Sequence, residues 1–134
     1  MRKKYVLDAN IPSLYFAGNN YVKKYIDEIY EGKAEAYMLE INLAEFLYHY
    51  ARAFGWRSAL VKNSLIRNSP IKIISMDEEL TLEAARLKMK YYQALSLADC
   101  YLIAFAKLHK AKVVTSDHVL KEINEVPVIL VPYK

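Results

Sequence analysis

Hydrophobic residues recur along this chain in two patterns that take turns from one end to the other. Short, continuous apolar runs are typical of buried strands, and stretches with apolar residues three or four positions apart predict amphipathic helices. The expected strands are 5–7, 36–41, 70–75, 112–116 and 126–131. The expected helices are 13–17, 21–29, 43–54, 56–66, 77–92 and 97–109.

The alternation of strands and helices predicts an α/β fold. A parallel sheet with helices on both faces, a three-layer α/β/α sandwich, is the arrangement that right-handed crossovers produce. Pro127 interrupts the last apolar run, so we expect that strand at an edge, where a missing N–H is tolerated. Asn20 is the expected N-cap of the second helix, and Gly32 its expected stop. With 134 residues, 54% of them hydrophobic, we expect one domain over 1–134.

The amino-acid composition argues against disulfide-rich and membrane-spanning proteins. A single cysteine excludes a disulfide framework and a thiolate metal cluster, which agrees with a reducing compartment. No apolar run approaches the roughly 18 residues that a membrane span needs, so we expect a cytoplasmic protein without a membrane partner. The net charge of +4 favours a polyanionic partner such as nucleic acid or an acidic polypeptide. The net charge alone does not identify a partner, because the lysines are dispersed along the chain and form no block.

Four carboxylates stand at junctions between the expected elements. Asp8 ends the first strand and Asp117 follows the fourth, while Glu45 and Asp99 lie at the starts of helices. Each also has a purely structural explanation. Glu45 lies three residues after Asn42, and Asp99 three after Ser96, as in capping boxes, and aspartate is common in turns after strands. Their conjunction in otherwise apolar sequence favours a shared site.

Carboxylates that converge in a partly desolvated pocket repel one another unless a cation lies between them. The donor set therefore indicates a metal. Oxygen ligands, without cysteine and without a histidine pair at ligand spacing, favour Mg²⁺ or Mn²⁺ over Zn²⁺. Such an ion can hold a phosphodiester and lower the pKa of a bound water.

Four segments carry a resemblance to a known family. They are 5–10 (YVLDAN), 42–46 (NLAEF), 96–104 (SLADCYLIA) and 114–117 (VTSD). In this order and at these intervals they resemble the acidic motifs of PIN-domain proteins, specifically the small toxins of VapBC toxin–antitoxin pairs. The resemblance covers nearly the whole chain.

This resemblance implies a metal-dependent endoribonuclease with a five-stranded parallel sheet of order 3-2-1-4-5. Asp8, Glu45, Asp99 and Asp117 would coordinate Mg²⁺ or Mn²⁺. Family members of this type form homodimers, act on RNA and are inhibited by a small antitoxin protein. Asn10 and Thr115 match polar motif positions, where they would orient ligands or water, or alternatively stabilise turns.

One position departs from the family pattern, and the roles of several other residues have more than one explanation. Many relatives carry another acid shortly after the fourth, where this chain has His118, so one-ion catalysis is an alternative to two. His49 is either a cleft-rim residue or a packing residue, and Cys100 and Glu40 are expected to lie outside the site. Candidates for phosphate contacts are Arg52, Arg57, Lys62 and Arg67.

A function of another class remains open beside the ribonuclease. In a non-catalytic binding protein with a PIN-like fold, the acids would be caps and the basic surface would engage an acidic partner. The two hypotheses differ in their response to divalent ions, because only a metal site makes stability depend on the ion.

Overall fold

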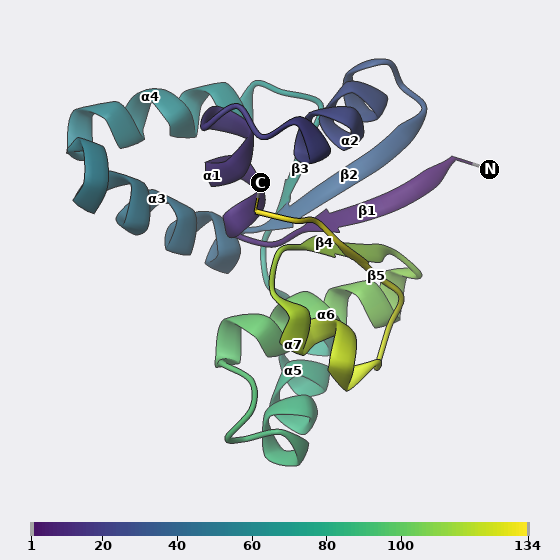
Figure 1. Cartoon of the computed structure of the whole chain (residues 1–134). Coiled ribbons are helices and arrows are strands. Elements are labelled where there is room, and N and C mark those ends of the chain that lie inside the picture. The colour runs from purple at the N-terminus through teal and green to yellow at the C-terminus, as the bar shows by residue number, and fades with distance from the viewer. Residues whose placement is uncertain (1, 134) are drawn as a thin grey trace.

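The computed structural model describes residues 2–133, which are built around a five-stranded parallel sheet (Figure 1). The strand order is β3-β2-β1-β4-β5, and every neighbouring pair is parallel. This confirms the expected sheet and places the first strand at its centre. The strands are β1 Lys3–Leu7, β2 Ala34–Leu39, β3 Lys72–Ile74, β4 Lys112–Thr115 and β5 Val128–Leu130.

Helices cover both faces of the sheet, which confirms the three-layer sandwich (Figure 1). The helices α1 Asn10–Phe16, α2 Asn20–Tyr30, α3 Glu40–Phe54 and α4 Trp56–Arg67 belong to one side. The helices α5 Glu78–Lys90, α6 Leu97–His109 and α7 His118–Ile123 belong to the other. Two separate clusters of buried side chains correspond to these two sides.

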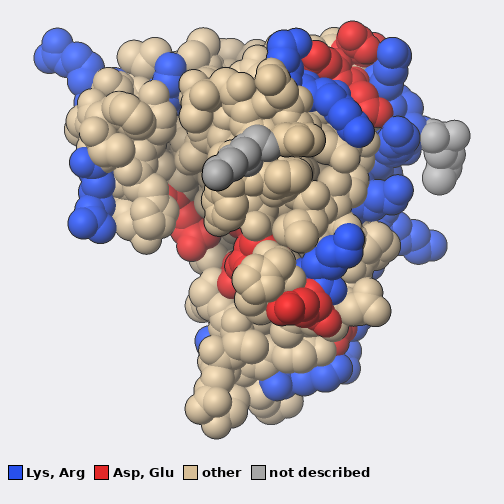
Figure 2. Space-filling view, viewed as in Figure 1, with Lys and Arg blue, Asp and Glu red and all other residues tan. Residues whose placement is uncertain are grey.

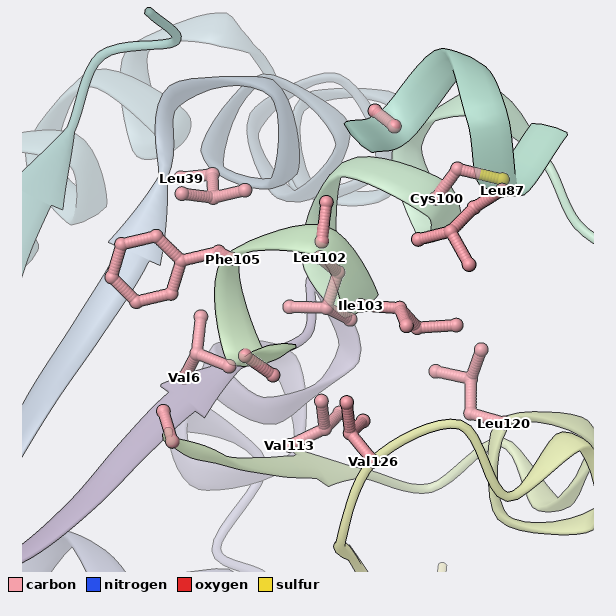
Figure 3. Packing of buried hydrophobic residues seen from close by; sticks show 14 of the residues in the cluster. Val6, Leu39, Leu87, Cys100, Leu102, Ile103, Phe105, Val113, Leu120 and Val126 are labelled. Carbon is pink, nitrogen blue, oxygen red and sulfur yellow. The ribbon is translucent and has the colours of Figure 1, made fainter. Parts of the chain in front are cut away.

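The centre of the sheet is buried on both faces because successive strand residues point to opposite sides. In β1, Val6 packs into the cluster on the α6 side, while Leu7 packs into the cluster on the α1 side, and both are fully buried. Figure 3 shows Val6 beside Leu102 and Phe105 of α6. The strand therefore ends deep in the molecule, and the next residue, Asp8, is also buried.

Helix α6 is apolar on most of its circumference because it is sandwiched between the sheet and α5. Residues from Leu102 to Ala106 are all buried, and Leu87 of α5 packs against the same cluster. Cys100 is fully buried beside Leu87 (Figure 3). Burial raises the pKa of its thiol, so Cys100 is a core residue, as expected.

Several expected boundaries are wrong. The N-cap of α2 is Asn19, whose side chain accepts from the backbone N–H groups of Tyr21 and Val22, and Asn20 is the first helical residue. The second strand begins and ends two residues earlier than expected, so α3 starts at Glu40. Asn42 consequently lies inside the helix and caps nothing.

The end of the chain also differs from expectation. Helix α7, only six residues long, was not expected, because so short a segment shows no reliable period. The last strand is shorter than the apolar run, and Pro127 precedes it rather than interrupting it. Its position at the edge, beside β4 alone, is as expected.

Helices α3 and α4 form a hairpin, which we call the α3–α4 arm, that projects from the body of the molecule (Figure 1). Gly55 makes the turn with a φ of +94°, a conformation that favours glycine. At its base the Arg67 guanidinium donates to both carboxylate oxygens of Glu40, at 2.7 and 3.0 Å. The arm carries large exposed apolar side chains: Tyr48, Phe54, Trp56, Leu60, Val61 and Leu65.

Candidate metal centre

Asp8 is the first residue after the central strand and is only 6% exposed. Its backbone N–H still donates to the Val114 carbonyl, as if the strand continued, so the side chain is fixed at the carboxyl end of the sheet. The carboxylate accepts from the Ala9 N–H at 2.7 Å and from the Thr115 hydroxyl at 2.6 Å. These two donors stabilise a charge that its surroundings otherwise disfavour.

Thr115 and Asp117 come from the end of the neighbouring strand β4. The Thr115 hydroxyl accepts from the Asp117 N–H at 3.0 Å while donating to Asp8, so it ties the two acidic segments together. The Asp117 carboxylate accepts from the Val119 N–H and caps α7. Asn10 accepts from the Ser116 N–H at 3.3 Å, so it holds the same turn from the other side. Asn10 and Thr115 therefore both hold the turn after β4, and Thr115 also binds the Asp8 carboxylate.

Asp99 lies in the first turn of α6, where Ser96 is the N-cap. The Ser96 hydroxyl accepts from the Asp99 N–H at 3.1 Å, and the Asp99 carboxylate accepts from the Ser96 N–H at 3.2 Å. This is the capping box expected from the sequence. One carboxylate oxygen is thereby engaged in the cap, and the side chain remains half-buried at the edge of the pocket.

Glu45 lies in the second turn of α3 and has no capping role, contrary to the capping-box interpretation. Burial and the charge of Asp99 raise its pKa, while Asn42 and His49 act in the opposite direction. The Asn42 side chain, one turn earlier, is fully buried, and neither its oxygen nor its nitrogen makes a hydrogen bond of good geometry.

All four acids line one pocket of about 370 Å³, which we call the acidic pocket. They reach it from four different parts of the chain: the end of β1, helix α3, the start of α6 and the turn after β4. Figure 2 shows acidic side chains gathered in a hollow between the α3–α4 arm and the helices on the other side of the sheet. The remaining lining residues are Ala9, Asn10, Ser13, Phe46, His49 and Ser96.

Burial and neighbouring charges alter the protonation of acids in this pocket. Burial, together with the charges of Asp99 and Glu45, raises the pKa of Asp8 from 3.8 to about 6, against the two hydrogen bonds that lower it. Two of the four carboxyl groups thus have raised pKa values, with neighbouring acids among the causes. Carboxyl groups whose pKa values are raised by burial and by neighbouring acids mark a candidate cation site.

The donor set fits a hard divalent cation such as Mg²⁺ or Mn²⁺, because it offers carboxylate oxygens and no thiolate. Within residues 2–133, however, no three acidic, histidine or cysteine side chains are already close enough to form a metal cluster. Metal binding therefore requires the carboxylates to draw together. Glu45 and Asp99 are only half-buried, and both line the pocket from helices.

Other expected site residues lie in different places. His49 lines the rim of the acidic pocket, one turn after Glu45, and His118 is exposed at the start of α7. Glu40 is outside the pocket and pairs with Arg67, so Arg67 is engaged in the structure of the arm. Of the other phosphate-contact candidates, the Lys62 ammonium lies over the Phe16 ring, while Arg52 and Arg57 are exposed.

Sequence reasoning missed Ser13, which lines the acidic pocket from α1. A signal for it existed. Ser13 lies three residues after Asn10, so once α1 is known to begin at Asn10 the two side chains share a helix face. The helix was expected to begin only at residue 13, which hid this relation.

Comparison with known proteins decides the family. The PIN domain matches residues 5–126, which include all four acids. The chain belongs to the PIN-domain family. This confirms the resemblance of the four acidic motifs, and PIN domains are generally nucleases. A search of curated proteins finds no match.

Solved structures of VapC-type toxins share the fold of this PIN domain. VapBC2 from Rickettsia felis, bound to a DNA fragment from its promoter, has a TM-score of 0.77 at 16% identity, covering 96% of this chain and 98% of that one. FitAcB from Neisseria gonorrhoeae has a TM-score of 0.72 at 24% identity, covering 93% and 96%. VapC20 from Mycobacterium tuberculosis, a sarcin-ricin loop cleaving toxin, has a TM-score of 0.71 at 12% identity, covering 89% and 94%.

The helices of this PIN domain are too short or too polar to cross a lipid bilayer anywhere in the described part of the chain.

Proposed function

We propose that this PIN domain is a Mg²⁺- or Mn²⁺-dependent endoribonuclease and the toxin of a toxin–antitoxin pair. The observation that supports it most is the acidic pocket, in which the charges of Asp99 and Glu45 help to raise the pKa of Asp8 and that of Asp99 helps to raise the pKa of Glu45. Carboxylates arranged in this way destabilise the protein unless they bind a cation, so a purely structural role does not explain them. The sarcin-ricin loop cleavage named for VapC20 supports RNA as the substrate.

The side chains have different parts in this mechanism. Asp8, Asp99 and Asp117 would hold the metal ion, with Thr115 fixing the Asp8 carboxylate and Ser96 fixing Asp99. A bound Mg²⁺ or Mn²⁺ supplies Lewis-acid polarisation of the phosphodiester and a water of lowered pKa. The raised pKa of Glu45 suits a general base, so its carboxylate would accept the proton of the attacking water.

The pocket supports one ion better than two. His118, where many relatives have a further acid, is exposed and is not among the residues that line the acidic pocket. With four carboxylates, of which Glu45 acts on water, three remain as direct ligands. We therefore propose one tightly held ion, with any second ion bound more weakly.

An antitoxin and a second copy of this chain are the proposed protein partners. A similar structure is a toxin–antitoxin complex from Klebsiella pneumoniae, and VapBC2 and FitAB are bound to DNA, which supports an antitoxin for this chain. A pocket of about 240 Å³ between α1, α2 and α4 suits an apolar segment of such a partner, and we call it the apolar pocket. Its lining residues are Leu7, Pro12, Tyr15, Phe16, Ile26, Tyr30, Leu65, Ile66, Ser69 and Ile71.

Divalent-ion titration tests the metal site directly. Mg²⁺ or Mn²⁺ should raise the melting temperature of the wild type, because an ion that binds only the folded state stabilises it. Asp99→Asn keeps an oxygen for the cap but removes the charge, so it should abolish both the metal-induced shift and RNA cleavage. Glu79→Gln, an exposed acid on α5, is the matched control and should behave as wild type.

The same experiment separates the ribonuclease from a non-catalytic binding protein. If divalent ions leave the melting temperature unchanged and RNA stays intact, the metal site is wrong and the acids are caps. The basic surface would then be the functional surface, engaging an acidic partner.

A further inference from the structure

A second pocket opens directly beside the acidic pocket, between α1 and the outer part of α3. It has a volume of about 260 Å³, and we call it the aromatic pocket. Two of its residues, Ser13 and His49, also line the acidic pocket, so the two cavities share a wall. The full lining is Ser13, Phe16, Ala17, His49, Tyr50, Ala53 and Phe54.

The aromatic rings of this pocket form a continuous series. Phe16 of α1 lies 6.3 Å from Tyr50 of α3, and Tyr50 lies 4.7 Å from Phe54, measured between ring centroids. Phe54 is 65% exposed at the far end of the series. One side of this ring packs against Tyr50, and most of the rest is open to solvent, where a flat ligand can reach it.

A positive charge lies next to these rings. The Lys62 ammonium of α4 is 4.7 Å from the centroid of Phe16 and 5.9 Å from that of Tyr50, within the range of cation–π attraction. Two rings of the pocket therefore lie close to a cation on α4 that is not itself a lining residue, at the border of the proposed phosphodiester site. This is the combination that single-stranded nucleic acid requires: rings for the bases and cations for the backbone.

We propose that the aromatic pocket binds one unpaired nucleobase of an RNA whose neighbouring phosphodiester lies in the acidic pocket. The proposal rests on the ribonuclease function and adds a position-specific subsite to it. The base would stack on Phe54 and Tyr50, with Lys62 drawing the adjacent phosphate. Ser13 and His49, on the shared wall, stand where the sugar connects base and phosphate.

The alternative occupants fit this pocket less well. The proposed binding site for an apolar segment of an antitoxin is the apolar pocket, which shares no lining residue with the acidic pocket. Among residues 2–133, the aromatic pocket shares two lining residues with the acidic pocket and the apolar pocket shares none, so a ligand that carries both a phosphate and a flat ring fits the first pair of cavities. A second copy of this chain would need no contact with the acids at all.

Binding of matched short strands tests the proposal. The probes are a labelled oligouridylate, a labelled oligoadenylate and an abasic ribose-phosphate strand of the same length, each titrated in Ca²⁺ and checked afterwards for intact length. Wild type should bind the two oligonucleotides more tightly than the abasic strand. Phe54→Ala should weaken oligonucleotide binding by roughly 5- to 150-fold and leave abasic binding unchanged. Phe54→Trp should restore the difference.

Trp56→Ala is the matched control, because Trp56 is equally exposed on the same arm but does not line the pocket. It should bind all probes as wild type does. Equal binding of the abasic strand and the oligonucleotides by wild type would overturn the proposal, as would unchanged binding by Phe54→Ala. A change of Phe54→Ala from dimer to monomer in sedimentation would also overturn it, since the pocket would then be an interface between copies.

The outcome is separable from that of the ribonuclease proposal. Base-dependent binding that disappears in Phe54→Ala supports the subsite even where no cleavage is detected. Metal-dependent cleavage with no loss of binding in Phe54→Ala supports the nuclease and removes the subsite.

Discussion

Asp8 is a carboxylate at a position whose burial favours the neutral acid. Its raised pKa, about 6, means that the folded protein holds this proton more tightly than the unfolded chain, where the pKa is near 3.8. Between these two values the folded state keeps a proton that the unfolded state has released. The free energy of unfolding therefore falls as pH rises through this window, by up to about 3 kcal/mol, and stays lower above it.

Asp8→Asn should remove this dependence on pH. In chelating buffer, the loss of unfolding free energy between pH 4 and pH 8 should be smaller in the variant by about 2–3 kcal/mol. Urea unfolding at several pH values measures this dependence. A hydrogen bond that the variant lacks at every pH lowers its stability by a constant amount, which drops out when two pH values are compared within that variant. Glu79→Gln, an exposed acid, should leave the wild-type dependence intact. An unaltered dependence in Asp8→Asn would show that Asp8 does not carry the charge penalty.

Thr115 is the residue that holds Asp8 and the Asp117 turn together. Thr115→Val preserves shape but removes the hydroxyl that donates to Asp8 at 2.6 Å. We expect Mn²⁺ affinity, measured by titration calorimetry, to fall by about 10- to 100-fold, as for other residues that orient metal ligands. Thr115→Ser keeps the hydroxyl and should retain most of the affinity. Equal affinities for Thr115→Val and wild type would restrict Thr115 to its turn.

At the scale of single elements, α6 begins with a cap that also positions a site residue. Ser96→Ala should cost about 1 kcal/mol of unfolding free energy, the usual cost of a lost N-cap, and should weaken Mn²⁺ binding because Asp99 loses its orientation. Asp77 caps α5 in the same way, by accepting from the Leu80 N–H at 2.9 Å, but lies outside the acidic pocket. Asp77→Ala should therefore cost similar stability without changing metal affinity. Urea unfolding and calorimetry on both variants test the difference.

The sequence predicts these elements unevenly, and the physical reason differs from one to the next. Ser96 and Asp99 have the spacing of a capping box, so the start of α6 was evident. The start of α3 was not, because its N-cap, Leu39, makes no side-chain bond, and apolar residues suit a buried strand and a buried helix equally well. The predicted capping role of Asn42 is therefore wrong.

The position of the acids followed from topology more than from local pattern. Parallel strands end at the same edge of a sheet, so Asp8 and Asp117, on β1 and β4, were expected together. The hydrogen bonds between them depend on register, which no sequence pattern fixes. The aromatic pocket could not be predicted from the sequence either, because Phe16 and Phe54 lie far apart in the chain and line one pocket only through the angle of the α3–α4 arm.

At the scale of the whole molecule, α5 offers a surface on which the proposed association with a second copy of this chain can be tested. The spacing of its apolar residues predicts one mostly apolar face, whereas the structure divides these residues between a buried and an exposed side. Leu80, Ala84 and Leu87 are buried against α6 and the sheet. The others face solvent: Leu82, Ala85 and Met89, with Leu82 65% and Met89 74% exposed. Spaced three and four residues apart, they form a stripe that no residue from 2 to 133 covers.

We expect wild type to sediment as a dimer and a variant with both Leu82→Glu and Met89→Glu to sediment as a monomer. A stable interface buries about 1,200–2,000 Å² in total, and two carboxylates introduced at its centre would lose hydration without gaining partners. Val61→Glu, which places a charge at an equally exposed apolar site on the α3–α4 arm, should remain a dimer. Sedimentation over a range of concentrations distinguishes the outcomes: a monomeric wild type, or a double variant that still dimerises, would place self-association elsewhere or exclude it.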